Sequence, residues 1–259
     1  MRPVRRILAL SSLSLLLFAA AASAQEIKVM TSGAFTAAYR ELVPQFEKKT
    51  HYKVTTAYGP SMGGEPNSIP MRLDRGEPVD VVILARQGLD DLVKKGKVIP
   101  ASCTDLVRSE TGMAVKAGAP KPDISTLDAF KKALLDAKSI AYSDSASGIY
   151  ISTELFQKLG IADQVLPKSK RTTGQVGLAV ARGDAEIGFQ QISELLPVKG
   201  IDVVGPLPPG AQRVIVFSAG IAVDSHNPDA AQRLIDFFTL PESARTISKS
   251  GLKPMHDRR

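Results

Sequence analysis

Short apolar runs alternate with amphipathic helical runs along nearly the whole chain. The first pair is a strand over residues 27–31 and a helix over residues 35–49, in which apolar side chains recur every three or four positions. The same alternation predicts strands at 53–58, 79–84, 113–116, 139–142, 185–190 and 213–223, and helices at 67–75, 89–95, 126–137, 148–159, 174–182, 229–238 and 241–248. Strands that alternate with helices are typical of an α/β protein whose sheets carry helices on both faces.

Two of the predicted strands are placed to connect two lobes. The strand-like segments near residues 112–116 and 213–219 separate one group of strand–helix units from another. We therefore expect a first lobe of residues 25–111 and 213–259, a second lobe of residues 112–212, and a central cleft between them. In open α/β sheets a ligand binds beyond the carboxyl ends of the strands, so the cleft is the expected site.

The first 24 residues have the pattern of a signal peptide. Three arginines precede an apolar run over residues 7–22, and Ala22-Ser23-Ala24 has the small-x-small form of a cleavage site. An uncleaved membrane anchor is the weaker alternative because the apolar run is short for a membrane span. We expect cleavage after Ala24, a periplasmic mature protein, and no membrane insertion, since no later segment is apolar enough to cross a bilayer.

Charge and cysteine content narrow the classes of function. The chain has 33 lysines and arginines against 26 acids, a formal net charge of +7, and loss of the signal-peptide arginines leaves about +4. This surplus is scattered, so it does not indicate nucleic-acid binding, but it suits a small anionic ligand. The single cysteine, Cys103, allows no intrachain disulfide, and the three dispersed histidines lack metal-site spacing. We expect neither a metal nor a cofactor, and we take the protein to be a monomer.

Four predicted strand-to-helix turns are rich in hydroxyl and glycine residues. They cover residues 31–33, 59–64, 143–148 and 171–175, where helices expose their first unpaired N–H groups. Helix N-termini bind anions, so the four turns together could hold one without a metal. Any single turn of this kind is more often an ordinary helix cap, and only their number favours a ligand site. The candidate donors are Ser32, Gly33, Ser61, Met62, Ser143, Ser145, Ser147, Gly148, Thr173 and Gln175.

Two arginines extend this candidate site. Arg86 follows the third apolar strand, and Arg171 opens the last of the four turns. Because a guanidinium binds a carboxylate through two parallel hydrogen bonds, both suit an organic acid as ligand. Arg40, Arg72 and Arg182 lie within predicted helices, so we assign those side chains to solvent.

Several familiar catalytic motifs are absent from the sequence. The segment GPSMG at residues 59–63 has the Gly-x-Ser-x-Gly spacing of a nucleophile elbow, but no histidine lies near the four turns to act as a base for Ser61. Walker-type phosphate loops and dinucleotide-binding glycine fingerprints are missing as well. The sequence therefore does not indicate a serine hydrolase or a nucleotide-dependent enzyme.

Four segments carry a resemblance to a known family. They are IKV at residues 27–29, QFE at 45–47, RGEPVDVVI at 75–83 and VARGDAEIGF at 180–189. With them the chain resembles periplasmic solute-binding proteins similar to the molybdate-binding component of ABC importers. The resemblance implies the two-lobe periplasmic binding protein type II fold, with two hinge strands and a central cleft. In that family the lobes close over an anion held by hydroxyls and backbone amides.

The anion-binding positions of that family are only partly kept. Ser61 matches the serine of the second turn, but Ala34 replaces a serine of the first turn and Gln191 replaces a tyrosine. Gln191 is therefore a further candidate ligand contact. With Arg86 and Arg171 added, the pocket suits a ligand with several carboxylates.

Three segments carry a narrower resemblance. They are TSGAFTAAY at residues 31–39, GPSMG at 59–63 and AYSDSASGIY at 141–150, and they resemble bacterial aconitate isomerases. That resemblance implies a cofactor-free interconversion of trans- and cis-aconitate, a small tricarboxylate, by an allylic proton shift.

The sequence does not identify the residue that moves the proton. Asp144 and Tyr150 are the candidates, with Glu65 as a third, although Asp144 is also suited to cap the helix that follows it. The alternative function is a transport receptor that delivers a molybdate-like oxyanion or a tricarboxylate to an ABC permease and does no chemistry.

Overall fold

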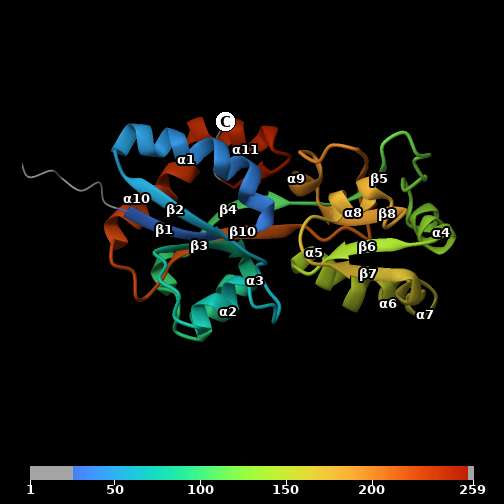
Figure 1. The fold of residues 1–259 in the computed structure, drawn as a ribbon, viewed down its shortest axis with the longest axis horizontal. Helices are drawn as coiled ribbons and strands as arrows, with labels where there is room; N and C mark the ends of the chain where they lie inside the picture. The colour runs from blue at the N-terminus through green and yellow to red at the C-terminus, as the bar shows by residue number, and fades with distance from the viewer. Residues whose placement is uncertain (1–25, 256–259) are drawn as a thin grey trace, which may run out of the picture.

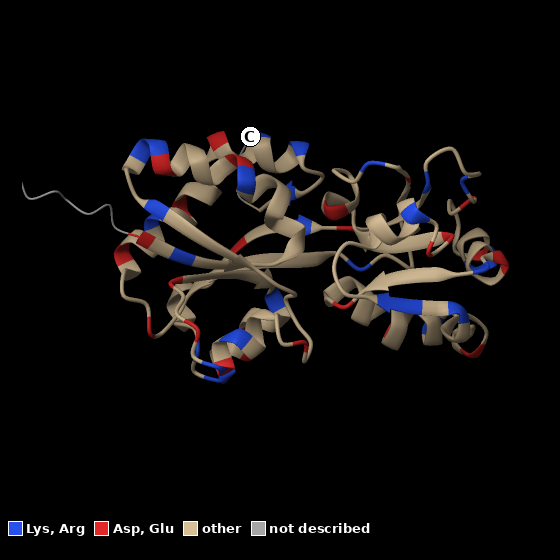
Figure 2. Cartoon of the chain, in the orientation of Figure 1, with Lys and Arg blue, Asp and Glu red and all other residues tan. Residues whose placement is uncertain are grey.

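The structure is a computed structural model that describes residues 26–255 as two α/β lobes lying end to end (Figure 1). The expected signal peptide, residues 1–24, lies outside the described residues. Within residues 26–255 no helix is both long and apolar enough to cross a membrane. Lysines, arginines and acids are spread over both lobes (Figure 2), as the scattered charge pattern predicts.

The first lobe is built on a mixed sheet of six strands. Their order is β11 (Lys253–Pro254), β4 (Thr104–Ser109), β10 (Ile215–Ile221), β3 (Val81–Ala85), β1 (Glu26–Thr31) and β2 (Lys53–Tyr58). Strand β1 is parallel to β2 and β3, and β10 is antiparallel to β3 and β4. One face is covered by α1 (Thr36–Thr50), α10 (Pro228–Thr239) and α11 (Pro241–Lys249), and the other by α2 (Ile69–Asp74) and α3 (Arg86–Lys94) (Figure 1).

The core of the first lobe explains its strongest sequence patterns. All five residues of β3 are buried, as its unbroken apolar sequence predicts for a strand covered on both faces. A short 3-10 helix, η1 (Gly33–Phe35), leads into α1. The Phe35 ring meets the Phe238 ring of α10 edge to face, with 5.3 Å between their centres. This packing fixes the start of α1 at the carboxyl end of β1.

The second lobe is built on a sheet of five strands. Their order is β7 (Ser169–Thr172), β6 (Ile140–Ser143), β8 (Ile187–Gln191), β5 (Thr111–Lys116) and β9 (Ile201–Pro206). Strand β6 is parallel to β7 and β8, whereas β5 is antiparallel to β8 and β9. The helices of this lobe are α4 (Leu127–Asp136), α5 (Ala146–Tyr150), α6 (Phe156–Lys158), α7 (Ala162–Val165), α8 (Val176–Arg182) and α9 (Ile192–Leu195). A buried cluster that includes Phe130, Phe156 and Phe189 forms its main core.

The chain passes between the two sheets at two places. Glu110 alone separates β4 from β5, and residues 207–214 join β9 to β10. Each expected crossing strand thus belongs to a single sheet, and the change of lobe falls just before it. The lobe boundaries expected at 111/112 and 212/213 stay predictions.

Several features differ from the sequence prediction: strands β4, β7, β9 and β11 were not expected, and two other differences are local. Arg171 lies inside β7, a polar strand at the edge of its sheet, and so does not open a turn. The helix expected over residues 148–159 is interrupted by a π-helical turn over Ile151–Leu155. There the Ser152 and Thr153 hydroxyls donate to the backbone carbonyls of Gly148 and Ile149, an alternative bonding pattern that an apolar periodicity does not reveal.

Candidate functional site

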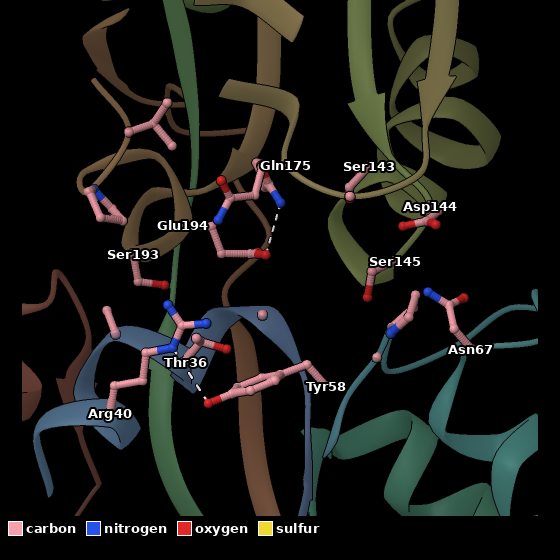
Figure 3. Close-up of a pocket in the computed structure, with 18 of the residues that line it drawn as sticks. Thr36, Arg40, Tyr58, Asn67, Ser143, Asp144, Ser145, Gln175, Ser193 and Glu194 are labelled. Atoms are coloured by element: carbon pink, nitrogen blue, oxygen red, sulfur yellow. Dashed lines mark hydrogen bonds between the residues drawn. The ribbon is translucent and has the colours of Figure 1, made fainter. Parts of the chain in front are cut away.

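A cavity of about 640 Å³ lies between the two lobes. The first lobe lines it with Gly33, Thr36, Ala37, Arg40, Glu41, Tyr58, Gly59, Pro60 and Asn67, and the second with Ser143, Asp144, Ser145, Gly174, Gln175, Gln190, Ser193, Glu194, Pro197 and Val198. Many of the polar side chains point toward one another across the cavity (Figure 3). It lies at the carboxyl ends of β1, β2, β6 and β8, where ligands of α/β sheets bind.

Arg40, near the start of α1, is the one arginine among the described lining residues. Its Nε donates to the Tyr58 hydroxyl at 3.5 Å, and its guanidinium carbon lies 5.1 Å from the centre of the Tyr58 ring. Arg40 is exposed, as expected for a helix surface, but the space it is exposed to is the cavity (Figure 3). Its other N–H groups therefore face the place where a ligand carboxylate would lie.

The turn between β6 and α5 forms the opposite wall. The Ser143 and Ser147 hydroxyls lie 3.1 Å apart, and the Gly148 N–H donates to Ser143 Oγ at 3.2 Å. A side chain at Gly148 would overlap the turn, because a Cβ there lies 1.7 Å from the Ser143 carbonyl oxygen. Ser143 and Ser145 line the cavity, whereas the structure uses Ser147 and Gly148 inside the turn instead of as ligand donors.

Asp144 lies in the same turn and is buried. Its Oδ2 has no hydrogen-bond partner among the described residues, and Ser145 takes the N-cap position of α5 that Asp144 was a candidate to fill. Burial raises the pKa of the Asp144 carboxyl, and Glu65 adds to the rise, whereas its own backbone N–H and Arg171 oppose it. Asp144 therefore holds a proton more readily than an ordinary aspartate.

Glu194 lies in α9, directly after β8, and sequence reasoning missed it. Gln190 Nε2 donates to Glu194 Oε1 at 2.8 Å (Figure 3). Gly33 of the first lobe faces this carboxyl so closely that a Cβ there would lie 1.9 Å from Oε1. The position of Glu194 in the sequence could have identified it, because it comes shortly after a predicted strand, as Arg86 does.

The electrostatics of Glu194 set it apart from the other lining carboxyls. Burial raises its pKa to about 7, and the negative charge of Asp144 adds to the rise. The hydrogen bonds from the Gln190 amide and the Gln191 backbone oppose it. Near neutral pH, protonated and ionised Glu194 are thus present in comparable amounts.

Ser61 and Met62, expected in the anion site, line a different cavity. That cavity, of about 390 Å³, is bordered by α2 and α3. Ser61 Oγ accepts from the Ala85 N–H at 3.0 Å, and the Ser61 N–H donates to Ser145 Oγ of the second lobe at 3.2 Å. Ser61 thus joins the two lobes, with both its hydroxyl and its amide already bonded.

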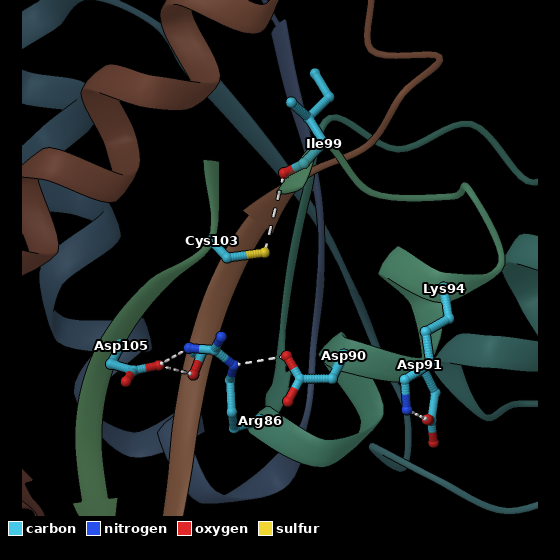
Figure 4. A network of polar contacts seen from close by, with 8 residues as sticks. Arg86, Asp90, Asp91, Lys94, Ile99, Cys103 and Asp105 are labelled. Carbon is cyan, nitrogen blue, oxygen red and sulfur yellow. Dashed lines mark hydrogen bonds and ion pairs between the residues drawn. The ribbon is translucent and has the colours of Figure 1, made fainter. Parts of the chain in front are cut away.

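The two arginines expected to bind a ligand are paired with carboxylates of the protein. Arg86, the first residue of α3, donates to Asp90 at 2.8 Å and to Asp105 at 2.7 Å (Figure 4). Arg171 donates to Glu65 of the first lobe at 2.8 Å. Neither lines the cavity between the lobes. The acids that engage them lie one helical turn away or on neighbouring segments, which the sequence alone does not place.

The remaining candidates divide between buried positions and the cavity wall. Gln191 accepts from Ser109 Oγ at 2.6 Å inside the protein, and Ser32 is buried with no partner for its hydroxyl among the described residues. Tyr150 donates its hydroxyl to the Ala211 carbonyl at 2.8 Å, away from the cavity, so its use as a proton carrier is not supported. Gly33 and Gln175 line the cavity, whereas Thr173 does not.

The cavity therefore combines two kinds of chemistry. Arg40 with the hydroxyl and amide side chains suits an anion. Two carboxyl groups, Asp144 and Glu194, have raised pKa values, and Glu194, at about 7, can take up or release a proton near neutral pH. Within residues 26–255 no group of three or more histidine, cysteine, aspartate or glutamate side chains is placed to hold a metal ion.

Comparison with known proteins identifies the family. The sequence model of the family described as bacterial extracellular solute-binding protein matches residues 27–253. An aconitate isomerase of a Pseudomonas species is 45% identical over 230 residues, 88% of each chain. A molybdate-binding protein of Azotobacter vinelandii is 29% identical over 248 residues, 91% of this chain and 92% of that protein.

Solved structures show the same fold. The periplasmic molybdate-binding protein of Azotobacter vinelandii superposes with a TM-score of 0.71 at 21% sequence identity, covering 87% of this chain and 98% of that one. This likeness confirms the two-lobe α/β fold expected from the sequence. The chain belongs to the bacterial extracellular solute-binding protein family.

Proposed function

We propose that this protein is an isomerase that interconverts trans- and cis-aconitate in the periplasm, without a cofactor and as a monomer. The observation that carries the proposal is the 45% identity to an aconitate isomerase over 88% of both chains. The cavity supports it, because anion-binding side chains and proton-transferring carboxyls line the same space.

The lining residues suit a small tricarboxylate. Arg40 can bind one carboxylate through two N–H groups, and the Thr36 and Ser145 hydroxyls and the Asn67 and Gln175 amides remain for the others. The start of α1 adds the partial positive charge of a helix N-terminus. Burial favours the protonated forms of two of the lining acids, which lessens their repulsion of a bound anion.

The chemistry requires only a mobile proton and a place for negative charge. A base removes a proton from the methylene carbon beside a carboxylate, and the charge spreads over that carboxylate and the double bond. A proton then returns at the other end of the allylic system. Fixed donors such as Arg40 and the hydroxyls lower the energy of this dienolate-like state because they need little rearrangement.

The test is conversion of substrate by the purified protein. We expect the protein to convert trans-aconitate to cis-aconitate without added metal or cofactor. Chromatography follows the two isomers until the same equilibrium is reached from either one. The heat-denatured protein serves as the control. Absence of conversion from both isomers would overturn the proposal.

A second function is favoured by the non-catalytic relatives. The 29% identity to a molybdate-binding protein is compatible with a receptor that delivers an oxyanion or a tricarboxylate to an ABC permease. Calorimetry with molybdate and with trans-aconitate separates the two functions. Tight molybdate binding without aconitate conversion would support the receptor.

A further inference from the structure

We propose that Glu194 carries the proton in the isomerisation, taking it from the methylene carbon of the substrate and returning it to the former vinyl carbon. The inference rests on the proposed function and assigns the residue that its chemistry requires. Among the three proton carriers considered from the sequence, Tyr150 donates to Ala211 and Glu65 pairs with Arg171, so neither is open to a substrate.

The fold holds Glu194 firmly at the wall of the cavity. The preceding residue, Ser193, is buried and donates its hydroxyl to the Ala34 carbonyl at 2.8 Å. This bond ties α9 of the second lobe to η1 of the first, so Glu194 lies where both lobes meet the cavity. Figure 3 shows its side chain directed into the space bounded by Thr36, Arg40 and Tyr58.

Gln190 orients the carboxyl of Glu194. The Val176 backbone N–H donates to Gln190 Oε1 at 2.9 Å, and a backbone N–H can only donate, so the Gln190 NH₂ group faces Glu194. Glu194 Oε1 accepts from that NH₂ group in both protonation states. The Gln191 backbone also donates to this carboxyl, so Glu194 is held by two donors of the protein while it takes and gives the proton.

The surroundings of Glu194 keep its pKa near neutral pH. Its pKa of about 7 reflects burial first and then the charge of Asp144, against the Gln190 and Gln191 hydrogen bonds. Among the described residues no lysine or arginine forms an ion pair with it, and Arg40 and Glu41 are the ionisable groups that the facing α1 brings to the cavity. A base whose pKa lies near the working pH transfers protons most efficiently.

The proposed step balances without any further reactant. Ionised Glu194 takes the methylene proton, and the electron pair of that C–H bond becomes the new double bond to the central carbon. The pair of the old double bond forms a C–H bond at the former vinyl carbon with the proton that Glu194 returns. The product is aconitate again, and rotation in the intermediate sets its geometry.

The first test replaces the carboxyl by an amide of the same shape. Glu194→Gln is expected to lower kcat for trans-aconitate by about 10²–10⁴-fold, with KM changed only a few-fold, because Arg40 and the hydroxyls are intact. Glu186→Gln, which changes an acid of the same lobe outside the cavity, serves as the matched control and should keep wild-type activity. Folding of each variant is checked by circular dichroism.

A second variant displaces the carboxyl without removing it. Gly33→Ala places a methyl group where Glu194 Oε1 lies, so the Glu194 side chain must move and kcat should fall. Gly64→Ala is the control, because no atom lies within 4 Å of a Cβ there.

The pH profile separates proton transfer from a structural role. Wild-type kcat should rise with pH through about 7 as Glu194 ionises. Asp144→Asn should move this rise to lower pH, because it removes a charge that raises the pKa of Glu194. An active wild type together with a fully active Glu194→Gln would overturn this inference alone, whereas an inactive wild type would overturn the proposed function with it.

Discussion

Arg40 should decide whether the cavity accepts a polycarboxylate. Arg40→Gln removes the one described guanidinium of the lining, and a lost charged hydrogen bond costs about 1.5–3 kcal/mol. Calorimetry with trans-aconitate should therefore show a dissociation constant raised by about one to two orders of magnitude. An unchanged constant would remove Arg40 from the binding site.

Arg86→Gln is the informative comparison for that experiment. Arg86 lies outside the cavity and pairs with Asp90 and Asp105. All three side chains are a third or more exposed, so their pairs contribute only about 0.2–1 kcal/mol each. We expect unchanged affinity and a slightly lower melting temperature.

These two arginines also show how far the sequence defines single residues. The strand-to-helix pattern places Arg86 at a strand end and Arg40 within a helix, where it was assigned to solvent. It cannot show that Asp105 reaches Arg86 from β4, a strand that the pattern does not predict. Glu194 was missed because its helix, α9, has only four residues and carries no periodicity to detect. A partner distant in sequence decided the case of Arg86, and the shortness of α9 decided that of Glu194.

At the scale of elements, the turn between β6 and α5 depends on Gly148. A methyl group there meets backbone atoms of Ser143, and backbone cannot yield as a flexible side chain does. Gly148→Ala should lower the free energy of unfolding by about 1–3 kcal/mol, measured by chemical denaturation. The matched variant Gly64→Ala should unfold like the wild type, and equal stability of the two variants would contradict the close approach seen here.

Elements with strong periodicity were predictable, and polar or short ones were not. The unbroken apolar run of β3 and the 3.6-residue pattern of α1 identify both elements without tertiary information. Strand β7 has the sequence SKRT and lies at a sheet edge, so its strand character comes from pairing with β6 alone. The two-lobe arrangement followed from the order of elements together with the family resemblance.

At the scale of the whole molecule, an ion pair joins the two lobes outside the lining of the cavity. Arg171 of β7 and Glu65 of the β2–α2 connection lie 2.8 Å apart. Arg171→Ala should favour the open arrangement and raise the KM for aconitate by about two- to five-fold, since exposed pairs contribute about 0.2–1 kcal/mol. Small-angle X-ray scattering should show a larger radius of gyration.

The control for that variant lies in the same lobe. Arg182 pairs with Asp184 at 2.8 Å within the second lobe, so Arg182→Ala removes a similar ion pair without releasing the lobes. A KM that rises equally in both variants would indicate a general charge effect and not an opening of the cleft.

Because the ion pair between Arg171 and Glu65 is exposed, ionic strength should also change how firmly the two lobes are held together. The Arg171 side chain is 59% exposed, and the Debye length shrinks from about 30 Å at 0.01 M salt to about 8 Å at 0.15 M. Added salt should loosen the contact between the lobes, while the bond from Gln190 and the burial of Glu194 leave its titration nearly unchanged. Salt would then act on substrate capture and pH on turnover, so the two steps can be varied independently in solution.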